Sequence, residues 1–444
     1  MRKQWRVLVG LVLALTLVVA ACGDDDDAAE ESSTTSTTQA PTTTEAPTTT
    51  EAPTTTEATT TTEATTTTEA PEVTPLLIWA DETRTPVVEA VAADFEAATG
   101  VPVEIELVGF GDIRNNMVQQ APLGEGADIF IGAHDWIGEL AVNGIVEPID
   151  LGPRAEEFFP VALNAFNFEG NLYGLPYAIE AIGLYRNVDL VPDAPATMED
   201  LLTVCEGLGD TVTQCLATPA GDAYHHYAFL SSAGGYIFNY DPATGYDAAD
   251  VGLDTDGAVA GFTVLSDLVA NGVLDPAVDY GTMTNLFFEG QAAFMWTGPW
   301  ELPNVQEAGI NYAVSPLPDI GGGTAAPFVG VQGFFVNAFS EQKALAQTFV
   351  LDYIATQDVM VELYNVGLRA PAHIASFDSV ADDPDVQAFG ESAGNGNPMP
   401  NIPEMASVWE NLANAVSAMY EQSATPEDAL ATAAEAVRSA VAGA

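Results

Sequence analysis

Basic residues are scarce in this sequence of 444 residues. It contains 10 Lys and Arg against 64 Asp and Glu, and its formal net charge is −54. A field of this sign repels phosphate backbones and anionic lipid headgroups, and it disfavours anionic ligands. We therefore expect no nucleic acid among the partners. Hydrophobic residues make up 48% of the chain, which is enough for a large core, and the length predicts two or three domains.

Cysteine and histidine are also scarce, which limits the possible metal sites. The chain has three cysteines and four histidines, with no Cys-x-x-Cys pair, no HExxH motif and no loop of EF-hand type. We therefore expect neither a metal nor another cofactor. Cys205 and Cys215 lie ten positions apart, in a segment that we expect outside the cytoplasm. A local disulfide is predicted between them, and two free buried thiols are the alternative.

Recognisable catalytic motifs are missing as well. The sequence contains no phosphate-cradling loop of P-loop type and no nucleophile elbow. With 64 carboxylates some close acid pairs are inevitable, so a secreted glycosidase that uses paired carboxylates stays as an alternative. We predict a binding protein that is not an enzyme, and we assign no catalytic residue.

Long hydrophobic runs are absent too, and the one near the N-terminus is too short for a comfortable membrane span. This run, Val7 to Val19, follows a basic start and is succeeded by two alanines and Cys22. The ending resembles a bacterial lipobox, which implies cleavage before Cys22 and a lipid on its sulfur. Residues 1–22 are thus predicted to be a lipoprotein signal peptide, and ordinary cleavage beside an incidental cysteine is the alternative.

Residues 23–73 have no large apolar side chains that could form a core. A run of four aspartates is followed by repeats of the type EAPTTT, which begin at Glu45 and Glu51. Such a composition cannot offset the entropy lost on ordering. We predict a disordered stalk that holds an extracytoplasmic folded part away from the membrane, with the lipid anchor as the only membrane contact.

An α/β pattern begins near position 75. Short apolar runs at 76–79, 101–107 and 128–132 alternate with segments of helical periodicity, which is typical of a parallel sheet. Ligands bind beyond the carboxyl ends of the strands in such sheets. Five polar or aromatic residues just past strand ends are therefore candidate site residues, with a helix cap or a solvated loop as the alternative for each: Asp81, Glu82, Arg84, Asp135 and Trp136.

One carboxylate interrupts an apolar stretch in the middle of the chain. Glu180 separates the run 177–179 from the run 182–185. An ionised Glu is costly to bury there unless other groups hydrogen-bond it. We predict that the chain crosses between two lobes here and that Glu180 faces the cleft, whereas a surface-turn Glu is the alternative. The Gly-rich apolar strand at 328–333 predicts a second crossing.

Aromatic residues beside polar turns suggest what the cleft binds. Trp136, Tyr224, Trp300 and Trp409 are of this kind, and Trp300 follows a Gly-Pro turn that tends to present side chains. Aromatic faces pack against the C–H face of a pyranose, while carboxylates and arginines hydrogen-bond its hydroxyls. The alternative is that these rings only fill the core.

Several ordered motifs together resemble the maltose- and maltodextrin-binding proteins of ABC importers, within the extracellular solute-binding superfamily. The resemblance covers essentially all of 75–440. Its most specific parts are GAHDWIGE at 132–139, LPYAIEAIGLYRNVDLVP at 175–192, AGGYIFNY at 233–240, TGPW at 297–300, PFVGV at 327–331 and MPNIPEM at 399–405.

The resemblance implies a set of ligand contacts. Asp135 and Glu180 would bind sugar hydroxyls, and Tyr224, Trp300 and Trp409 would stack on successive rings. The other implied contacts are Asp81, Glu82 and Arg84 near the first strand, Asp222 at the cleft, Arg369 in a loop near it and Met399 at the far subsites. The chain departs from the family at three positions: Trp136 and Ala413 replace arginines, and Gly132 replaces a tryptophan.

The implied fold is a two-lobed α/β fold of the periplasmic-binding-protein type, with discontinuous lobes joined by a hinge. The lobes would comprise 75–179 with 332–378, and 183–328 with 384–444. A monomer would close on an oligosaccharide and deliver it to the permease subunits of an ABC transporter. The departures leave open another sugar, such as trehalose, or a polyol, and the long stalk leaves open a sensory or adhesive surface protein.

Overall fold

A computed structural model of the chain describes residues 73–241 and 244–443. The predicted signal peptide, the predicted lipidation site Cys22 and nearly all of the predicted stalk lie outside these residues. None of the described helices is both long enough and apolar enough to cross a membrane.

The first lobe is built on an eight-stranded sheet. Its main strand order is β15-β7-β14-β3-β1-β2, and β4 and β16 pair with further parts of β14. The strands are β1 (Leu76–Ala80), β2 (Val103–Leu107), β3 (Ile129–Ala133), β4 (Val146–Glu147), β7 (Leu175–Ala181), β14 (Phe328–Asn337), β15 (Ala370–Pro371) and β16 (Asn397–Pro398). β1, β2 and β3 are parallel, whereas β14 runs antiparallel to β3 and β7.

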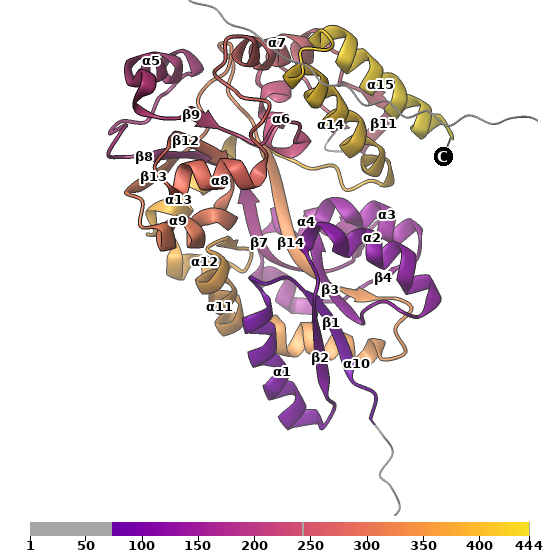
Figure 1. Ribbon diagram of the computed structural model, residues 1–444. Coiled ribbons are helices and arrows are strands. Elements are labelled where there is room, and N and C mark those ends of the chain that lie inside the picture. The colour runs from indigo at the N-terminus through magenta and orange to yellow at the C-terminus, as the bar shows by residue number, and fades with distance from the viewer. Residues whose placement is uncertain (1–72, 242–243, 444) are drawn as a thin grey trace, which may run out of the picture. The chain divides into compact units, whose positions relative to one another are not determined.

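Helices surround this sheet (Figure 1). They are α1 (Thr85–Thr99), α2 (Phe110–Gln120), α3 (Ile137–Val142), α4 (Pro160–Ala165), α10 (Lys343–Thr348), α11 (Gln357–Gly367) and α12 (Ile374–Val380). The short elements are the 3-10 turns Ala121–Leu123, His134–Trp136 and Gly152–Glu157 and the hairpin of β5 (Asn167–Phe168) and β6 (Asn171–Leu172).

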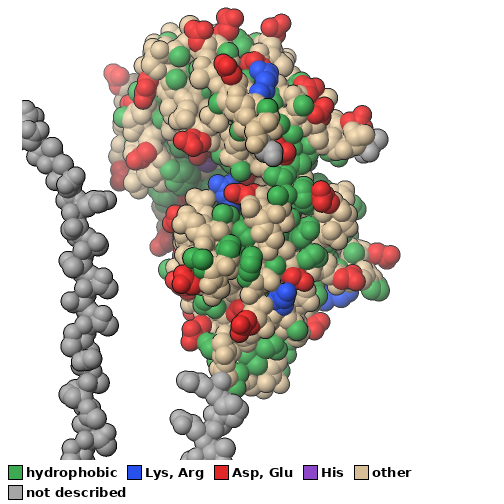
Figure 2. Space-filling view, turned by 90° about the vertical axis from the view of Figure 1, so that its right-hand side faces the viewer, with side chains coloured by type: hydrophobic (Ala, Val, Ile, Leu, Met, Phe, Trp, Pro, Cys, Tyr) green, Lys and Arg blue, Asp and Glu red, His purple; other side chains and the backbone are tan. Residues whose placement is uncertain are grey.

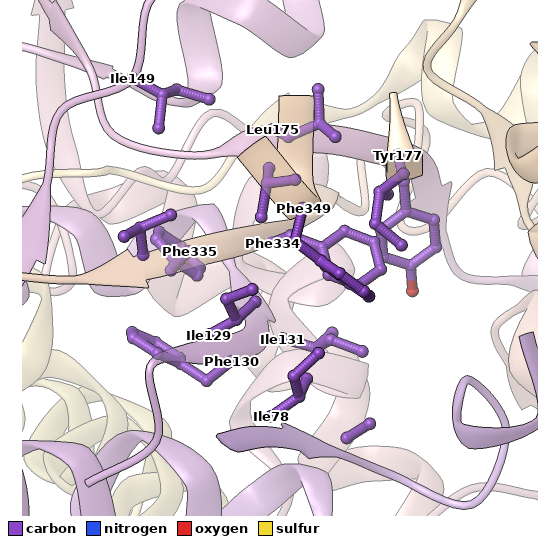
Figure 3. Close-up of a cluster of buried hydrophobic side chains, with 14 of the residues drawn as sticks. Ile78, Ile129, Phe130, Ile131, Ile149, Leu175, Tyr177, Phe334, Phe335 and Phe349 are labelled. Atoms are coloured by element: carbon purple, nitrogen blue, oxygen red, sulfur yellow. The ribbon is translucent and has the colours of Figure 1, made fainter. Parts of the chain in front are cut away.

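Aliphatic and aromatic side chains from distant parts of the chain form the core of the first lobe. Figure 3 shows Ile129, Phe130 and Ile131 of β3 beside Phe334 and Phe335 of β14. Phe130 and Phe335 stack with ring centroids 5.1 Å apart. The same core draws residues from 76–178 and from 331–372, so β14 returns the chain to the first lobe.

The second lobe is built on a four-stranded sheet with the order β13-β8-β12-β9. Its core draws residues from 182–328 and from 399–437. The strands are β8 (Gly183–Asn187), β9 (Gln214–Ala217), β12 (Ala292–Thr297) and β13 (Tyr312–Ser315), and a separate hairpin joins β10 (Phe238–Asp241) to β11 (Gly245–Val251). The helices are α5 (Met198–Leu208), α6 (Ala223–Ser232), α7 (Asp256–Ala270), α8 (Tyr280–Phe288), α9 (Leu302–Ala308), α13 (Pro384–Asn395), α14 (Ala406–Tyr420) and α15 (Pro426–Gly443), with 3-10 turns at Gly209–Thr211, Pro299–Glu301 and Pro403–Met405.

The chain passes between the two sheets where the predicted crossings lie. β7 belongs to the large sheet and β8, one residue later, belongs to the small one. β14 makes the return, because Phe328 lies in the second core and Val331 in the first. The structure is therefore a two-lobed α/β fold, as predicted.

Helix ends show how local sequence sets these elements. Thr197 and Asp200 form a capping box at the start of α5, which begins at Met198 as predicted. Thr85 and Pro86 have the pattern of an N-cap and a first helical residue, which predicts a helix from Pro86, whereas α1 begins at Thr85. Thr85 donates its hydroxyl to the carbonyl of Asp81 at 2.8 Å and does not cap the helix.

A second difference lies in the segment predicted as helices over 340–357 and 358–365. It forms α10, then a π-helical turn at Phe349–Ile354, and then α11. Phe349, Val350 and Ile354 of the turn are buried in the first core. The wider turn fits these apolar positions to the core, which helical periodicity alone does not predict.

Cys205 and Cys215 form a disulfide with Cα atoms 5.5 Å apart. The bond joins α5 to β9 in the second lobe.

Candidate functional site

Glu180 lies at the end of β7, beside the crossing into the second lobe. Only 7% of this residue is exposed, and its carboxylate is paired on both oxygens. Gln332 of β14 donates to Oε1 at 2.7 Å, and Arg369 donates its Nε–H to Oε2 at 2.9 Å. These partners meet the condition under which a Glu can be buried, so the surface-turn alternative is wrong.

Asp81 and Arg84 pair with each other in the first lobe. Arg84 donates to the Asp81 carboxylate and to the Tyr177 hydroxyl, and both members of the pair are buried. Burial lowers the pKa of Arg84, but Tyr177 and Asp81 outweigh it and the pKa is raised overall. Glu82, beside them in sequence, is exposed.

Asp135 connects the two lobes. The indole of Trp409, on α14 of the second lobe, donates to Asp135 Oδ2 at 3.2 Å. Asp135 is 6% exposed, and burial raises the pKa of its carboxyl to about 6, against the opposing charge of Arg114. An ionised Asp135 is therefore a strong hydrogen-bond acceptor that this structure stabilises only weakly.

Trp136 turns back over its own strand. A Cβ atom at Gly132 would lie 2.3 Å from Cζ3 of the Trp136 indole, so that ring occupies the space of a side chain at 132. The ring also contacts Phe110, with centroids 5.1 Å apart, and the guanidinium of Arg84 lies 5.5 Å from the Phe110 ring. The chain differs from the family pattern at both 132 and 136, and these two differences are coupled. Gly132 lacks the tryptophan of the family pattern, and the ring of Trp136 fills the space that this side chain would occupy.

The predicted stacking residues of the second lobe form one aromatic cluster. Tyr224 lies 6.0 Å from Trp300 and 5.9 Å from Phe328, which in turn lies 5.7 Å from Trp409. The Trp300 ring is folded over Gly298, where a Cβ would approach the indole to 2.1 Å. Its indole N–H donates to the hydroxyl of Tyr280 at 2.6 Å.

Asp222 has a structural role as well as a predicted binding role. Its Oδ1 accepts from the backbone N–H of His225 and lies 2.8 Å from the Nδ1 atom of that imidazole. Burial alone would raise the pKa of Asp222, but His225 outweighs it and the pKa is well below its usual range. His225 also lies between Tyr280 and Trp300 in the cluster.

Two buried polar atoms at the lobe boundary lack a hydrogen-bond partner among the described residues. They are the hydroxyl of Tyr224 and Oε1 of Gln332. Burial raises the pKa of Tyr224 well above its usual value, and the negative charges of Glu180, Asp135 and Asp222 raise it further. An unpaired buried hydroxyl is costly, and a polar ligand would satisfy it.

Most of the predicted residues thus lie together, from both lobes. Glu82 is exposed, and Met399 is buried beside the crossing strand, with its backbone N–H donating to Val329 O at 3.3 Å.

The predictions missed Tyr280 and Gln332, which carry no motif of their own. They also missed His134, whose Nδ1 accepts from Val331 N–H and whose Nε2 lies 3.0 Å from Met399 O. Burial lowers the pKa of His134 to about 4, so the imidazole is neutral at pH 7.

Comparison with known protein families agrees with this geometry. The family described as bacterial extracellular solute-binding protein matches residues 90–393. The chain belongs to this family. This bacterial extracellular solute-binding protein also has relatives among characterised proteins, and the resemblance predicted from the motifs is confirmed.

Three relatives cover most of the solute-binding protein. The maltotriose-binding protein of Pyrococcus abyssi (strain GE5 / Orsay) is 31% identical over 325 residues, which are 71% of this chain and 70% of the relative. The galactooligosaccharide-binding protein of Bacillus subtilis (strain 168) is 26% identical over 377 residues, 82% of this chain and 88% of the relative. The maltooligosaccharide ABC transporter solute-binding lipoprotein of Streptococcus pneumoniae (strain ATCC BAA-255 / R6) is 27% identical over 388 residues, 83% of this chain and 90% of the relative.

Proposed function

We propose that this solute-binding protein binds maltodextrin-like oligosaccharides between its lobes, without turning them over, and delivers them to the permease of an ABC importer. The observation that carries the proposal is the unpaired Tyr224 hydroxyl, buried beside the ring cluster and near carboxylates of both lobes. A neutral sugar supplies hydroxyls for those polar groups and a C–H face for the rings. The names of the relatives from Pyrococcus abyssi and Streptococcus pneumoniae support this ligand class.

The binding residues in this proposal divide between the lobes. Asp81, Arg84, Asp135, Trp136, Glu180 and Arg369 act from the first lobe, with Glu82 at its rim. Asp222, Tyr224, Trp300 and Trp409 act from the second, and Met399 lies beside the crossing strand. Because only contacts that are better in the closed form shift the equilibrium, ligand groups touching both sets drive hinge closure.

The lobe boundaries proposed here are 75–179 with 332–378 for the first lobe and 183–328 with 384–444 for the second. The hydrophobic clusters support them, because one draws its buried residues from the first lobe and the other two draw almost all of theirs from the second.

We further propose that the protein is a monomer held outside the cytoplasm by a lipid on Cys22, after cleavage of the signal peptide before that residue. The family is extracellular, and the relative from Streptococcus pneumoniae is named as a lipoprotein. The stalk at 23–73 would then separate the cleft from the membrane.

A second candidate ligand is a galactooligosaccharide. The relative from Bacillus subtilis is named for that sugar, and the Trp136 ring over Gly132 changes the first-lobe surface relative to maltodextrin binders. The Trp136 ring fills the side-chain space at 132, and position 136 then offers no arginine guanidinium to a ligand, so a different linkage is accommodated at this position.

Isothermal titration of the full-length protein against maltotriose, galactotriose and trehalose tests these assignments. Binding of maltotriose supports the maltodextrin proposal, and binding of galactotriose alone moves the assignment to the second candidate. Trp300→Ala should weaken binding about tenfold, since one aromatic stack contributes about 1 kcal/mol beyond the buried area and 1.4 kcal/mol corresponds to a factor of ten.

A matched control is Phe339→Ala, which removes a half-exposed ring at the far end of β14. We expect it to leave affinity unchanged. Equal affinity of Trp300→Ala and the parent protein would refute the role of Trp300. Release of product from a chromogenic glycoside would refute binding without turnover.

A further inference from the structure

A cavity of about 1140 Å³ is lined almost entirely by residues outside the predicted site. Its walls come from His134 and 161–169 of the first lobe, from 227–240 and 244–246 of the second lobe, and from the connecting segment 397–402. Of the predicted ligand contacts, only Met399 is among the described residues that line it. The volume exceeds the range of about 300–1,000 Å³ typical of small-molecule pockets, so it suits a ligand of several rings.

The cavity lining carries little charge, in contrast to the rest of the molecule. Figure 2 shows acidic side chains scattered over the face it displays, with few basic ones. Among the described residues that line the cavity, however, Glu169 is the only carboxylate and none is Lys or Arg. A neutral polar ligand therefore does not have to displace a charged side chain from its partner in order to bind here. An anion, in contrast, is disfavoured by the net charge of −54.

Aromatic rings form one wall of the cavity. Tyr240 and Tyr246 of the β10–β11 hairpin contact each other with centroids 4.8 Å apart, and 57% of Tyr240 is exposed. Tyr246 donates its hydroxyl to the carbonyl of Pro398 at 3.2 Å, which holds its ring against the connecting segment. Phe168 lies on the wall contributed by the first lobe. Exposed, positioned rings of this kind offer faces on which sugar rings can stack.

Side-chain amides line the same space. Asn401 donates to the carbonyls of Ala165 and Asn167, at 3.0 and 2.9 Å, and so joins the connecting segment to the first lobe. Asn164 and Asn239 are exposed, come from different lobes and make no side-chain hydrogen bond to another described residue. Each side-chain amide therefore keeps two N–H donors and one carbonyl acceptor for a ligand. A sugar hydroxyl can accept from the first and donate to the second.

We propose that this cavity is a second binding site, which takes a neutral oligosaccharide. Tyr240 and Tyr246 stack on its rings, and Asn164 and Asn239 hydrogen-bond its hydroxyls from opposite lobes. Because the walls belong to both lobes, a bound sugar biases their relative position. By linkage, occupancy of this site and of the main site then change each other's affinity by the same factor.

Isothermal titration of the full-length protein with maltoheptaose tests the proposal, carried to millimolar sugar. We expect two binding events in the parent protein. A double variant, Tyr240→Ala with Asn164→Ala, should retain the tighter event and lose the weaker one. Tyr240→Ala alone should weaken that event about two- to tenfold, as expected for one aromatic stack. Phe339→Ala, with its ring outside both sites, should leave both events intact.

The titration distinguishes failure of the second binding site from failure of the proposed function, because each site gives its own binding event. A cleft variant, Trp300→Ala with Glu180→Gln, should lose the tighter event and keep the weaker one. If the parent protein shows no tight event but the weaker one is sensitive to Tyr240→Ala, the second site stands and the proposed function fails. A single event in the parent protein, or two events that both survive the Tyr240 and Asn164 double variant, would overturn the second site.

Discussion

The carboxyl group of Asp135 should make the unliganded protein less stable while it makes ligand binding stronger. Burial raises its pKa to about 6, and the Trp409 indole is its hydrogen-bond donor from the other lobe. An acid whose pKa is raised on folding is destabilising above the folded pKa, and the penalty disappears as the pH falls toward its unfolded pKa. From these two pKa values the penalty is about 3 kcal/mol at pH 7 and about 1 kcal/mol at pH 4.5.

Asp135→Asn removes the charge but keeps an oxygen that can accept from Trp409. In urea unfolding of the ligand-free protein, we therefore expect the variant to be more stable by up to about 3 kcal/mol at pH 7. The gain should shrink to about 1 kcal/mol at pH 4.5, where the parent Asp135 is mostly protonated. The difference between variant and parent isolates this group from the many other carboxylates that titrate in the same range.

The same substitution should weaken sugar binding. Hydrogen bonds to a charged acceptor contribute about 1.5–3 kcal/mol, so replacing the carboxylate should cost about 10- to 100-fold in affinity. Asp94→Asn, which removes an exposed charge from α1, is the control and should change neither quantity by more than about 0.5 kcal/mol. A variant no more stable than its parent at pH 7, or a gain at pH 4.5 as large as the gain at pH 7, would refute the reasoning.

Two further predictions concern stability. Arg369→Ala leaves Glu180 buried without its ion-pair partner and should lower the free energy of unfolding by about 3–5 kcal/mol, and Glu180→Gln in the same chain should restore part of it. Replacing both Cys205 and Cys215 with Ser removes the disulfide, which joins residues 10 positions apart. The free energy of unfolding should fall by about 3 kcal/mol, because the unfolded chain gains conformational entropy. Urea unfolding measures both effects.

The controls for these two predictions are internal to the chain. If Glu180→Gln does not rescue Arg369→Ala, the loss comes from packing of the arginine stem and not from an uncompensated charge. Reduction of the parent protein should reproduce the double Cys replacement, and an unchanged unfolding midpoint on reduction would contradict the disulfide's contribution.

Elements that depend on local patterns were predicted well from sequence. The α/β order followed from apolar periodicity, and the helix predicted near Met198 to Leu208 is α5. The crossing at Glu180 also followed, since a carboxylate between two apolar runs needs a special environment. Prediction was poorer where the outcome depended on packing. Leu107 is an apolar position of the predicted strand at 101–107, but 63% of it is exposed because β2 lies at the edge of the sheet.

The sequence predicted which residues form the candidate site, but it did not predict which side chains contact one another there. Some members were found because polar and aromatic side chains follow strand ends, whereas others, such as Asp222, Arg369 and Met399, came from the family resemblance. Their roles depend on partners that only the folded chain brings near. Arg369 pairs with Glu180 across 189 positions, and Trp409 donates to Asp135 across 274. Sequence spacing carries no information on such pairs, which depend on where β14 and α14 return.

The sequence by itself therefore determined the α/β class, the family motifs, the acidic charge and the residues that can recognise a neutral sugar. The charge, the fold class and the candidate residues at strand ends follow from composition or local periodicity, whereas the motifs and the remaining candidates follow from the family resemblance. Only the tertiary structure decided that Asp81 and Arg84 neutralise each other, that the Trp136 ring fills the space above Gly132 and that the Tyr224 hydroxyl is buried unpaired. It also decided that tyrosines and asparagines of distant segments enclose a second cavity. These features arise from the close packing of segments that are far apart in sequence, and the free energy of each depends on its neighbours in space.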